Sequence, residues 1–213
     1  MINILSYDSY LFDMDGTLVD SEKLKGEALA KVCISVGGSA SLHDYKHVLG
    51  GSWETVRAHF YNLSKINIPH KDFDEMFRSM YQELISSKVE VTNGAEELLN
   101  SLKINNKKIG IVTSATRWMA DEILNNINLS ENFDVLVTKE NVSKHKPDPE
   151  AYLLALKQLN TAAEDALIFE DSAVGIEAGK RAGCKVIGIT HELNSTHDFS
   201  DTSLTIKDFN ELL

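Results

Sequence analysis

The stretch that decides the fold is Tyr10-Leu11-Phe12-Asp13-Met14-Asp15-Gly16-Thr17-Leu18-Val19-Asp20-Ser21. Its first three side chains are apolar and the run stops at Asp13, which is the pattern of a short buried strand that ends in a polar turn near Gly16. In an open sheet of parallel strands, ligands bind beyond the carboxyl ends of the strands. The stretch therefore predicts a strand that presents carboxylates at a binding edge.

The rest of the sequence alternates short apolar runs with helical patterns. Further strand-like runs are Ile109–Val112, Phe133–Val137, Ala166–Phe169, Lys185–Ile189 and Leu204–Ile206. Helix-like stretches are Ala95–Lys103, Thr116–Asn126, Asp148–Leu159 and Ala173–Ala182. Such alternation favours parallel strands joined by right-handed crossovers. The predicted fold class is α/β, with a doubly wound parallel, Rossmann-like sheet.

A long insertion interrupts this alternation after the first strand. Ninety-five residues lie between Asp13 and Ile109, whereas the later strands begin about 20 to 30 residues apart. The inserted residues show helical periodicity and no convincing strand. We therefore expect an inserted all-helical domain, hinged near Thr17–Asp20 and Val89–Gly94. The predicted division is a core domain of residues 1–20 and 90–213 and a helical cap domain of residues 21–89.

Composition and charge restrict the class of protein. The 213 residues include 21 Lys and Arg against 32 Asp and Glu, for a formal charge of −11. No basic stripe is visible that could release counterions from a nucleic acid, and no run approaches the roughly 18 apolar residues of a membrane helix. Met1–Leu18 lacks a basic n-region. We expect a cytoplasmic monomer that binds neither nucleic acid nor membrane, with Cys33 and Cys184 as reduced thiols.

Polar side chains follow four of the predicted strands. In strand order they are Asp13 and Asp15, then Thr113 and Ser114, then Lys146, then Glu170 and Asp171. Because the carboxyl ends of parallel strands share one edge of the sheet, five charged groups and two hydroxyls should converge there.

This convergence has a chemical meaning. Clustered carboxylates cannot all stay ionised without a cation, and a hard divalent ion with oxygen ligands, most simply Mg²⁺, supplies one. A metal ion, a lysine and hydroxyl groups are what phosphoryl transfer needs, because the reaction consists mostly of positioning and charge neutralisation. One carboxylate can form an aspartyl-phosphate, while a second, two residues on, protonates the leaving oxygen and later activates water.

Four motifs resemble, in order and spacing, those of the haloacid dehalogenase (HAD) superfamily. They are Asp13–Ser21, Ile111–Ser114, Lys146–Pro149 and Phe169–Ser172. The chain looks like the phosphatase and phosphohexomutase branch, which carries a helical cap between the first two motifs, and the resemblance spans nearly the whole chain. It implies a HAD-like phosphoric monoester hydrolase whose partner is a small phosphorylated metabolite, such as a sugar or polyol phosphate.

The resemblance also implies roles for single residues. The catalytic pair would be Asp13 as nucleophile and Asp15 as general acid and base, and a general acid argues against the dehalogenase branch, where halide departure needs none. The phosphate-binding groups would be the Thr113 hydroxyl, a backbone N–H at Ser114 and the Lys146 ammonium. The Mg²⁺ ligands would be Asp13, the main-chain carbonyl of Asp15, Glu170 and Asp171.

Three cap residues are candidates for substrate specificity. Lys25 and Arg57 could meet an anionic or hydroxylated substrate, and Trp53 could stack on a sugar face. A solvated cation or an aromatic in the cap core explains each of them equally well.

Two alternatives to a phosphatase stay open. A β-phosphoglucomutase-like phosphohexomutase would pass the same intermediate to a sugar, but the mutases that this chain resembles have histidine at Lys25 and arginine near Trp53. A non-catalytic phospho-acceptor or binding module would need neither the acid Asp15 nor a helical cap. Both comparisons favour a hydrolase.

Overall fold

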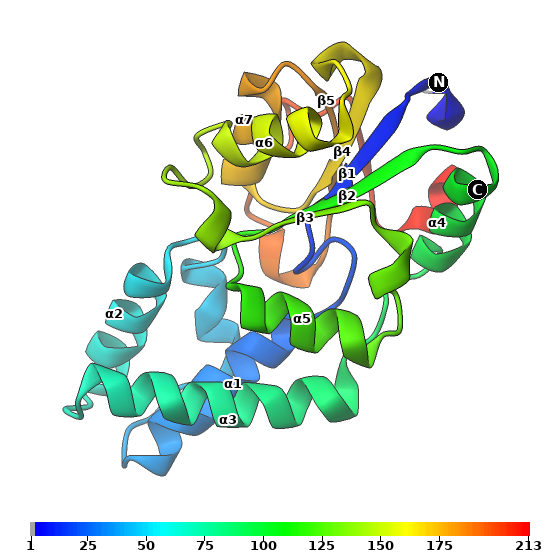
Figure 1. Cartoon of the computed structure of the whole chain (residues 1–213). Helices are drawn as coiled ribbons and strands as arrows, with labels where there is room; N and C mark the ends of the chain where they lie inside the picture. Colours follow the sequence, from blue (N-terminus) through cyan, green and yellow to red (C-terminus); the bar gives the residue numbers. More distant parts are fainter. Residues whose placement is uncertain (1–2) are drawn as a thin grey trace.

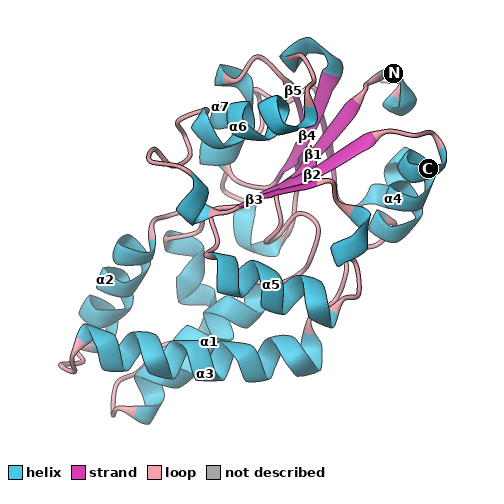
Figure 2. Cartoon of the chain, viewed as in Figure 1, coloured by secondary structure: helices cyan, strands magenta, loops and turns pink. Residues whose placement is uncertain are grey.

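The computed structural model describes residues 3–213, and a six-stranded sheet forms its centre (Figures 1 and 2). Every pairing in the sheet is parallel, in the order β3-β2-β1-β4-β5-β6. The strands are β1 (Ser9–Phe12), β2 (Lys108–Val112), β3 (Val135–Val137), β4 (Ala166–Glu170), β5 (Lys185–Ile189) and β6 (Leu204–Ile206). The strand order reverses beside β1, so the predicted doubly wound α/β fold is confirmed.

The register of the three central strands places their ends at one level. Phe12 of β1 is aligned with Ile111 of β2 and with Phe169 of β4. The backbone N–H of Asp13 continues the ladder by donating to the carbonyl of Phe169, at 2.9 Å. The polar residues that follow these strands therefore begin side by side at the same edge of the sheet.

Helices cover both faces of the sheet (Figure 1). Leu11 points to the core made by α6 (Glu150–Leu159) and α7 (Ala173–Arg181). Tyr10 and Phe12 point to the opposite core, which includes residues of α4 (Ala95–Ile104) and α5 (Arg117–Asn126). This alternation is the period-2 geometry of a strand, and it explains why the three residues Tyr10–Phe12 of β1 are all large and apolar.

Two of the predicted elements begin two residues before the observed ones. Helix α6 begins at Glu150 rather than Asp148, because Pro149 is its N-cap and the Asp148 carboxylate accepts the backbone N–H of Glu150 at 3.1 Å. Strand β3 begins at Val135 rather than Phe133, because the Asp134 carboxylate turns back to accept the backbone N–H of Ile109 at 2.8 Å.

The insertion between β1 and β2 is helical, as predicted. Its helices are α1 (Glu22–Ser35), α2 (Trp53–Ser64) and α3 (His70–Lys88), with a short 3₁₀ helix, η2 (Leu42–His47). They lie together below the sheet in Figure 1. Helix α3 presents buried side chains at helical spacing, Phe73, Phe77, Tyr81 and Leu84, and packs along α1. The predicted domain boundaries at residues 20–21 and 89–90 stay predictions.

The two connections between the insertion and the sheet pair with each other. The backbone N–H of Asp20 donates to the carbonyl of Glu90 at 3.0 Å, and that of Thr92 donates to the carbonyl of Leu18 at 2.9 Å. Val19 and Val91 form an antiparallel bridge between them. Both connections therefore form one short ribbon beneath the Asp13–Asp15 turn.

The remaining elements are short 3₁₀ helices. They are η1 (Ile4–Ser6), η3 (Ser130–Asn132), η4 (Lys139–Asn141), η5 (Ala163–Asp165), η6 (Glu192–Asn194) and η7 (Phe209–Leu212). Within residues 3–213, no helix is both long enough and apolar enough to pass through a membrane.

Candidate active site

A cavity of about 760 Å³ lies at the carboxyl edge of the sheet, where the helical insertion faces it. Six residues predicted from the strand ends line it, namely Asp13, Asp15, Thr113, Ser114, Lys146 and Asp171. Lys25 and Trp53 line it from the insertion. The structure thus brings together residues from both sides of the 95-residue interruption.

Asp13 and Lys146 form a buried ion pair. The Lys146 ammonium donates to Oδ1 of Asp13 at 2.6 Å, to the carbonyl of Val112 at 3.0 Å, and to Glu170. Burial raises the pKa of Asp13 well above its usual value, against the lowering effect of Lys146. Burial alone would lower the pKa of Lys146, but Asp13 and Glu170 outweigh it and raise that pKa. Lys146 is therefore held as a cation with all three of its N–H donors engaged.

Glu170 is fully buried beneath this pair and does not line the cavity. One carboxylate oxygen accepts from Lys146 and from the Tyr152 hydroxyl, the latter at 2.9 Å. The other accepts from the backbone N–H groups of Asp171 and Ser172, both at 3.1 Å, and from the Ser172 hydroxyl at 3.0 Å. With five donors on two oxygens, Glu170 fixes Lys146 and the start of α7 in place.

Three carboxylates form a cluster that suits a divalent cation. Asp13, Glu170 and Asp171 are all buried, and each offers an oxygen within 4.8 Å of the others. Burial, together with Glu170 and Glu22, raises the pKa of Asp171 well above its usual value. Such a cluster resists ionisation unless a cation joins it, and carboxylate oxygens are the ligands that Mg²⁺ prefers. The residues present therefore fit Mg²⁺.

Gly16 is required by the turn that carries this chemistry. Its φ of +78° lies in the left-handed region, and a Cβ atom there would lie 2.5 Å from Oδ2 of Asp171. A side chain at this position would push the first strand end away from the fourth. The glycine of the Asp13–Ser21 motif thus sets the distance between two strand ends.

Asp15 is held by groups from the insertion. Its Oδ1 accepts from the Ser21 hydroxyl at 2.6 Å and from the Tyr81 hydroxyl at 3.4 Å. The Lys25 ammonium lies 3.2 Å from the same oxygen and 3.3 Å from Oε2 of Glu22. Burial disfavours a charged Lys25, but the two carboxylates outweigh burial and raise its pKa well above the usual value. Lys25 is therefore a buried cation inside the site, not a solvated one.

The two hydroxyl residues after β2 differ in exposure. Thr113 is buried, and its Oγ1 accepts the backbone N–H of Ala115 at 3.0 Å, which leaves the hydroxyl proton available for donation. Ser114 is exposed on the cavity wall. Both residues line the same cavity as Lys146.

Trp53 and Arg57 are neighbours on α2 but have different surroundings. Trp53 lines the cavity, packs against Phe77 with ring centroids 4.6 Å apart, and donates from Nε1 to Asp74 at 3.0 Å. Arg57 pairs with both oxygens of Asp74, at 2.7 and 3.0 Å, and does not line the cavity. The structure therefore brings Trp53 to the site and engages Arg57 in an ion pair within the insertion.

Three residues that contact the site carboxylates were not predicted from the sequence. Tyr81 and Tyr152 read as ordinary core aromatics on helices, yet their hydroxyls reach Asp15 and Glu170. His191 contacts Asp171 from the loop after β5. Only the position of His191 just beyond a strand end offered a signal, the same one that found the other residues.

Comparisons with known proteins agree with this geometry. The sequence profile of haloacid dehalogenase-like hydrolases matches residues 10–189. The chain is 32% identical to a phosphorylated carbohydrates phosphatase of Thermotoga maritima, over 88% of this chain and 87% of that one. It is 33% identical to a validoxylamine A 7′-phosphate phosphatase of Streptomyces hygroscopicus, over 97% and 96% of the two chains. A crystal structure of a candidate β-phosphoglucomutase from Thermotoga maritima is 30% identical, with a TM-score of 0.80 over 94% of each chain.

Proposed function

The chain belongs to the haloacid dehalogenase-like hydrolase family, and we propose that it is a Mg²⁺-dependent phosphatase of a small phosphorylated metabolite. The observation that carries the proposal is the pair Asp13 and Asp15, which line one cavity but have different partners. Asp13 is paired with Lys146 of the core, and Asp15 with groups of the insertion. Two carboxylates in different surroundings can take two different roles in one reaction.

Asp13 is the proposed nucleophile. Lys146 is the only hydrogen-bond partner of its carboxylate among residues 3–213, and it binds Oδ1, which leaves Oδ2 for attack. In the first step Oδ2 forms a bond to phosphorus while the ester P–O bond breaks, which gives an aspartyl-phosphate. Lys146 and the Thr113 hydroxyl stabilise the charge on the transferring phosphoryl oxygens.

Asp15 is the proposed proton carrier. It gives a proton to the leaving oxygen in the first step and takes one from the attacking water in the second. That water displaces the Asp13 carboxylate from phosphorus and releases inorganic phosphate. Ser21 and Tyr81 hold Oδ1 of Asp15, so the orientation of the carboxylate is fixed by residues of the insertion, outside the turn after β1 that carries Asp15.

Asp13, Asp171 and the main-chain carbonyl of Asp15 are the proposed Mg²⁺ ligands, with Glu170 beside them. The bound ion would supply positive charge to the phosphoryl group. Because Glu170 already accepts five hydrogen bonds, we assign its main effect to the positioning of Lys146 and Ser172.

The apolar part of the cavity lining suits the carbon skeleton of a sugar or polyol phosphate. It includes Trp53, Phe77, Trp118 and Met119, and apolar C–H faces pack well against such rings. The names of the two phosphatase relatives, one for phosphorylated carbohydrates, support this substrate class.

The strongest alternative is a β-phosphoglucomutase-like enzyme, since one similar structure bears that description. A mutase must hold the far end of a sugar phosphate while its intermediate turns around. Arg57, the arginine of α2, is engaged by Asp74 and does not line the cavity, and Trp53 offers a ring rather than a cation. The arginine that does line the cavity, Arg78 of α3, lies over the ring of Trp118. We therefore favour water over a sugar hydroxyl as the acceptor in the second step.

An assay with β-glucose 1-phosphate, Mg²⁺ and catalytic glucose 1,6-bisphosphate separates the two activities. Glucose 6-phosphate and inorganic phosphate are followed together. The phosphatase proposal expects phosphate release that does not depend on the bisphosphate. Efficient isomer formation with little phosphate release would assign the chain to the mutases.

We also propose that residues 21–89 act as a cap over a core of residues 1–20 and 90–213. The ribbon formed by Leu18–Asp20 and Glu90–Thr92 is the proposed hinge. Cap closure would exclude bulk water from the phosphoenzyme. A cytoplasmic location and a monomeric state remain predictions from the sequence.

A further inference from the structure

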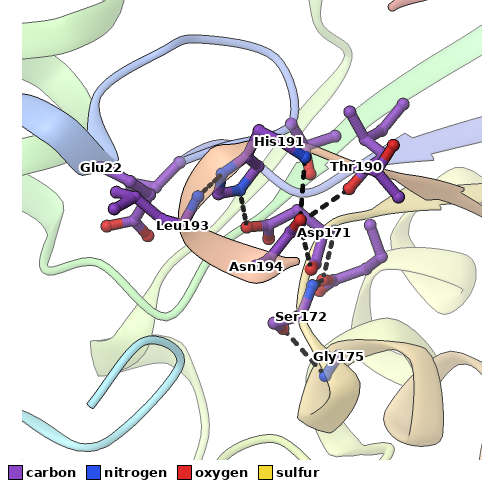
Figure 3. A network of polar contacts seen from close by, with 12 residues as sticks. Glu22, Asp171, Ser172, Gly175, Thr190, His191, Leu193 and Asn194 are labelled. Carbon is purple, nitrogen blue, oxygen red and sulfur yellow. Dashed lines mark hydrogen bonds and ion pairs between the residues drawn. The ribbon is translucent and has the colours of Figure 1, made fainter. Parts of the chain in front are cut away.

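A turn that follows β5 reaches across to Asp171 (Figure 3). It comprises His191 and the 3₁₀ helix η6 (Glu192–Asn194). Nε2 of His191 lies 2.9 Å from Oδ2 of Asp171. None of the four strand-end motifs includes this turn, so it adds a fifth strand end to the site.

The hydrogen bonds of the His191 ring decide its tautomer. The backbone N–H of Leu193 donates to Nδ1 at 3.3 Å, so Nδ1 is an acceptor and carries no proton. A neutral imidazole has its single proton on the other nitrogen, Nε2. His191 therefore donates from Nε2 to the carboxylate of Asp171.

Asn194 fixes the same aspartate through its backbone. It is fully buried, and its side-chain amide donates to the main-chain carbonyls of Asp171 and Ile189, both at 2.9 Å. Its side-chain oxygen accepts the backbone N–H of His191 at 2.8 Å. One turn thus holds Asp171 at two points, by the carbonyl through Asn194 and by the carboxylate through His191.

The other side of Asp171 is anchored to α7. The Ser172 hydroxyl accepts the backbone N–H of Gly175 at 3.1 Å, which caps the helix directly after the aspartate. Oδ1 of Asp171 has no hydrogen-bond partner among residues 3–213, whereas Oδ2 is engaged by His191. Oδ1 of Asp171 is therefore the carboxylate oxygen that is available to a ligand.

We propose that His191 is a positioning residue for the Mg²⁺ site, which orients Asp171 by binding Oδ2 and so presents Oδ1 to the ion, with Asn194 supporting the turn. This inference rests on the proposed function, because it needs Asp171 to be a ligand. Partners that orient metal ligands in this way are worth about 10–100-fold in metal affinity or activity.

The test is titration calorimetry with Mg²⁺ alone, on variants first checked for a native circular dichroism spectrum. His191→Phe keeps an aromatic ring but removes the donor, and it should weaken Mg²⁺ binding about 10–100-fold. His191→Gln keeps an N–H donor and should retain most of the affinity. Glu192→Gln changes a neighbour in the same turn that does not contact Asp171, and it should bind like wild type. If His191→Phe does not fold, His191→Met, which also lacks a donor, replaces it.

Asp171→Asn separates this inference from the proposed function. If wild type binds Mg²⁺, Asp171→Asn does not, and His191→Phe binds as tightly as wild type, the positioning role is overturned while the metal site stands. A His191→Gln variant as weak as His191→Phe would also overturn it, since the donor would then not be the cause. A wild-type protein that does not bind Mg²⁺ would overturn the metal site and this inference with it.

Discussion

The ammonium nitrogen of Lys25 lies 3.2 Å from Oδ1 of Asp15, and this contact joins helix α1 of the insertion to the turn that follows β1. Oε2 of Glu22 lies 3.3 Å from the same ammonium, so one cation faces two carboxylates. Only 12% of the Lys25 side chain and 8% of each carboxylate side chain is exposed to solvent. The proposed proton carrier therefore depends on a residue of the insertion for its charge balance.

Replacement of Lys25 should be costly to stability. Lys25→Met leaves Asp15 and Glu22 buried without their cation, and removal of one partner from a buried ion pair typically costs about 3–5 kcal/mol. The free energy of unfolding, from urea denaturation, should fall by about that amount. Adding Glu22→Gln should restore part of the loss, because one of the two uncompensated charges is then removed.

Lys31→Met is the matched control, because Lys31 lies on the same helix and pairs with Glu27 at the surface. Exposed pairs of this kind contribute about 0–1 kcal/mol. If Lys25→Met and Lys31→Met lower the free energy of unfolding by equal amounts, the buried Lys25 contact stabilises the protein no more than an exposed ion pair does.

Asp15→Asn should separate proton transfer from metal binding. An amide cannot deliver a proton to the leaving oxygen, so kcat should fall by at least the ~10²-fold typical of a lost general acid. The main-chain carbonyl remains, and Mg²⁺ affinity measured by calorimetry should change little. Loss of Mg²⁺ binding in this variant would instead assign the Asp15 carboxylate to direct ligation.

Hydrogen exchange should report movement at the proposed hinge. The amides of Asp20 and Thr92 donate across the ribbon, and they should exchange more slowly once Mg²⁺ and a phosphate mimic are bound. Amides of β4, in the centre of the sheet, serve as the control and should not change. If the ribbon amides keep their rates while the mimic is bound, the cap does not move at this hinge.

The thiol of Cys184 should be inert in the folded protein. The side chain is buried, and loss of solvation raises its pKa to about 12, so the reactive thiolate is scarce at pH 8. Labelling by iodoacetamide at pH 8 should therefore be much slower than in urea, where the pKa returns toward its ordinary value. Equal labelling rates in buffer and in urea, read by mass spectrometry, would contradict this burial.

The fold was largely predictable because its strands are local apolar runs and their parallel order places the strand ends together. Asp13, Thr113 and Lys146 could be placed at one edge without knowing any tertiary contact. The exact start of β3 could not, because it depends on the Asp134 carboxylate accepting the N–H of Ile109, 25 residues away.

Most of the site was predictable because its residues follow strands, whereas Lys25 and Trp53 of the insertion were candidates whose surroundings only the structure shows. Arg57 forms an ion pair with Asp74, which lies on another helix, and therefore does not serve the cavity. No local sequence pattern indicates that pairing. Tyr81 and Tyr152 occupy positions that helical periodicity assigns to the core, and only the packed structure shows which acids their hydroxyls reach. The roles assigned to individual site residues remain predictions.

The most direct test of the proposed function is release of inorganic phosphate from a panel of sugar and polyol phosphates, by wild type and Asp13→Asn, with Mg²⁺ and with excess chelator. Wild type should release phosphate only when Mg²⁺ is present, and Asp13→Asn should be inactive under both conditions, because an amide cannot accept the phosphoryl group. Asp13→Asn turnover within tenfold of wild type, or wild-type turnover that persists in chelator, would contradict a Mg²⁺-dependent aspartyl-phosphate mechanism.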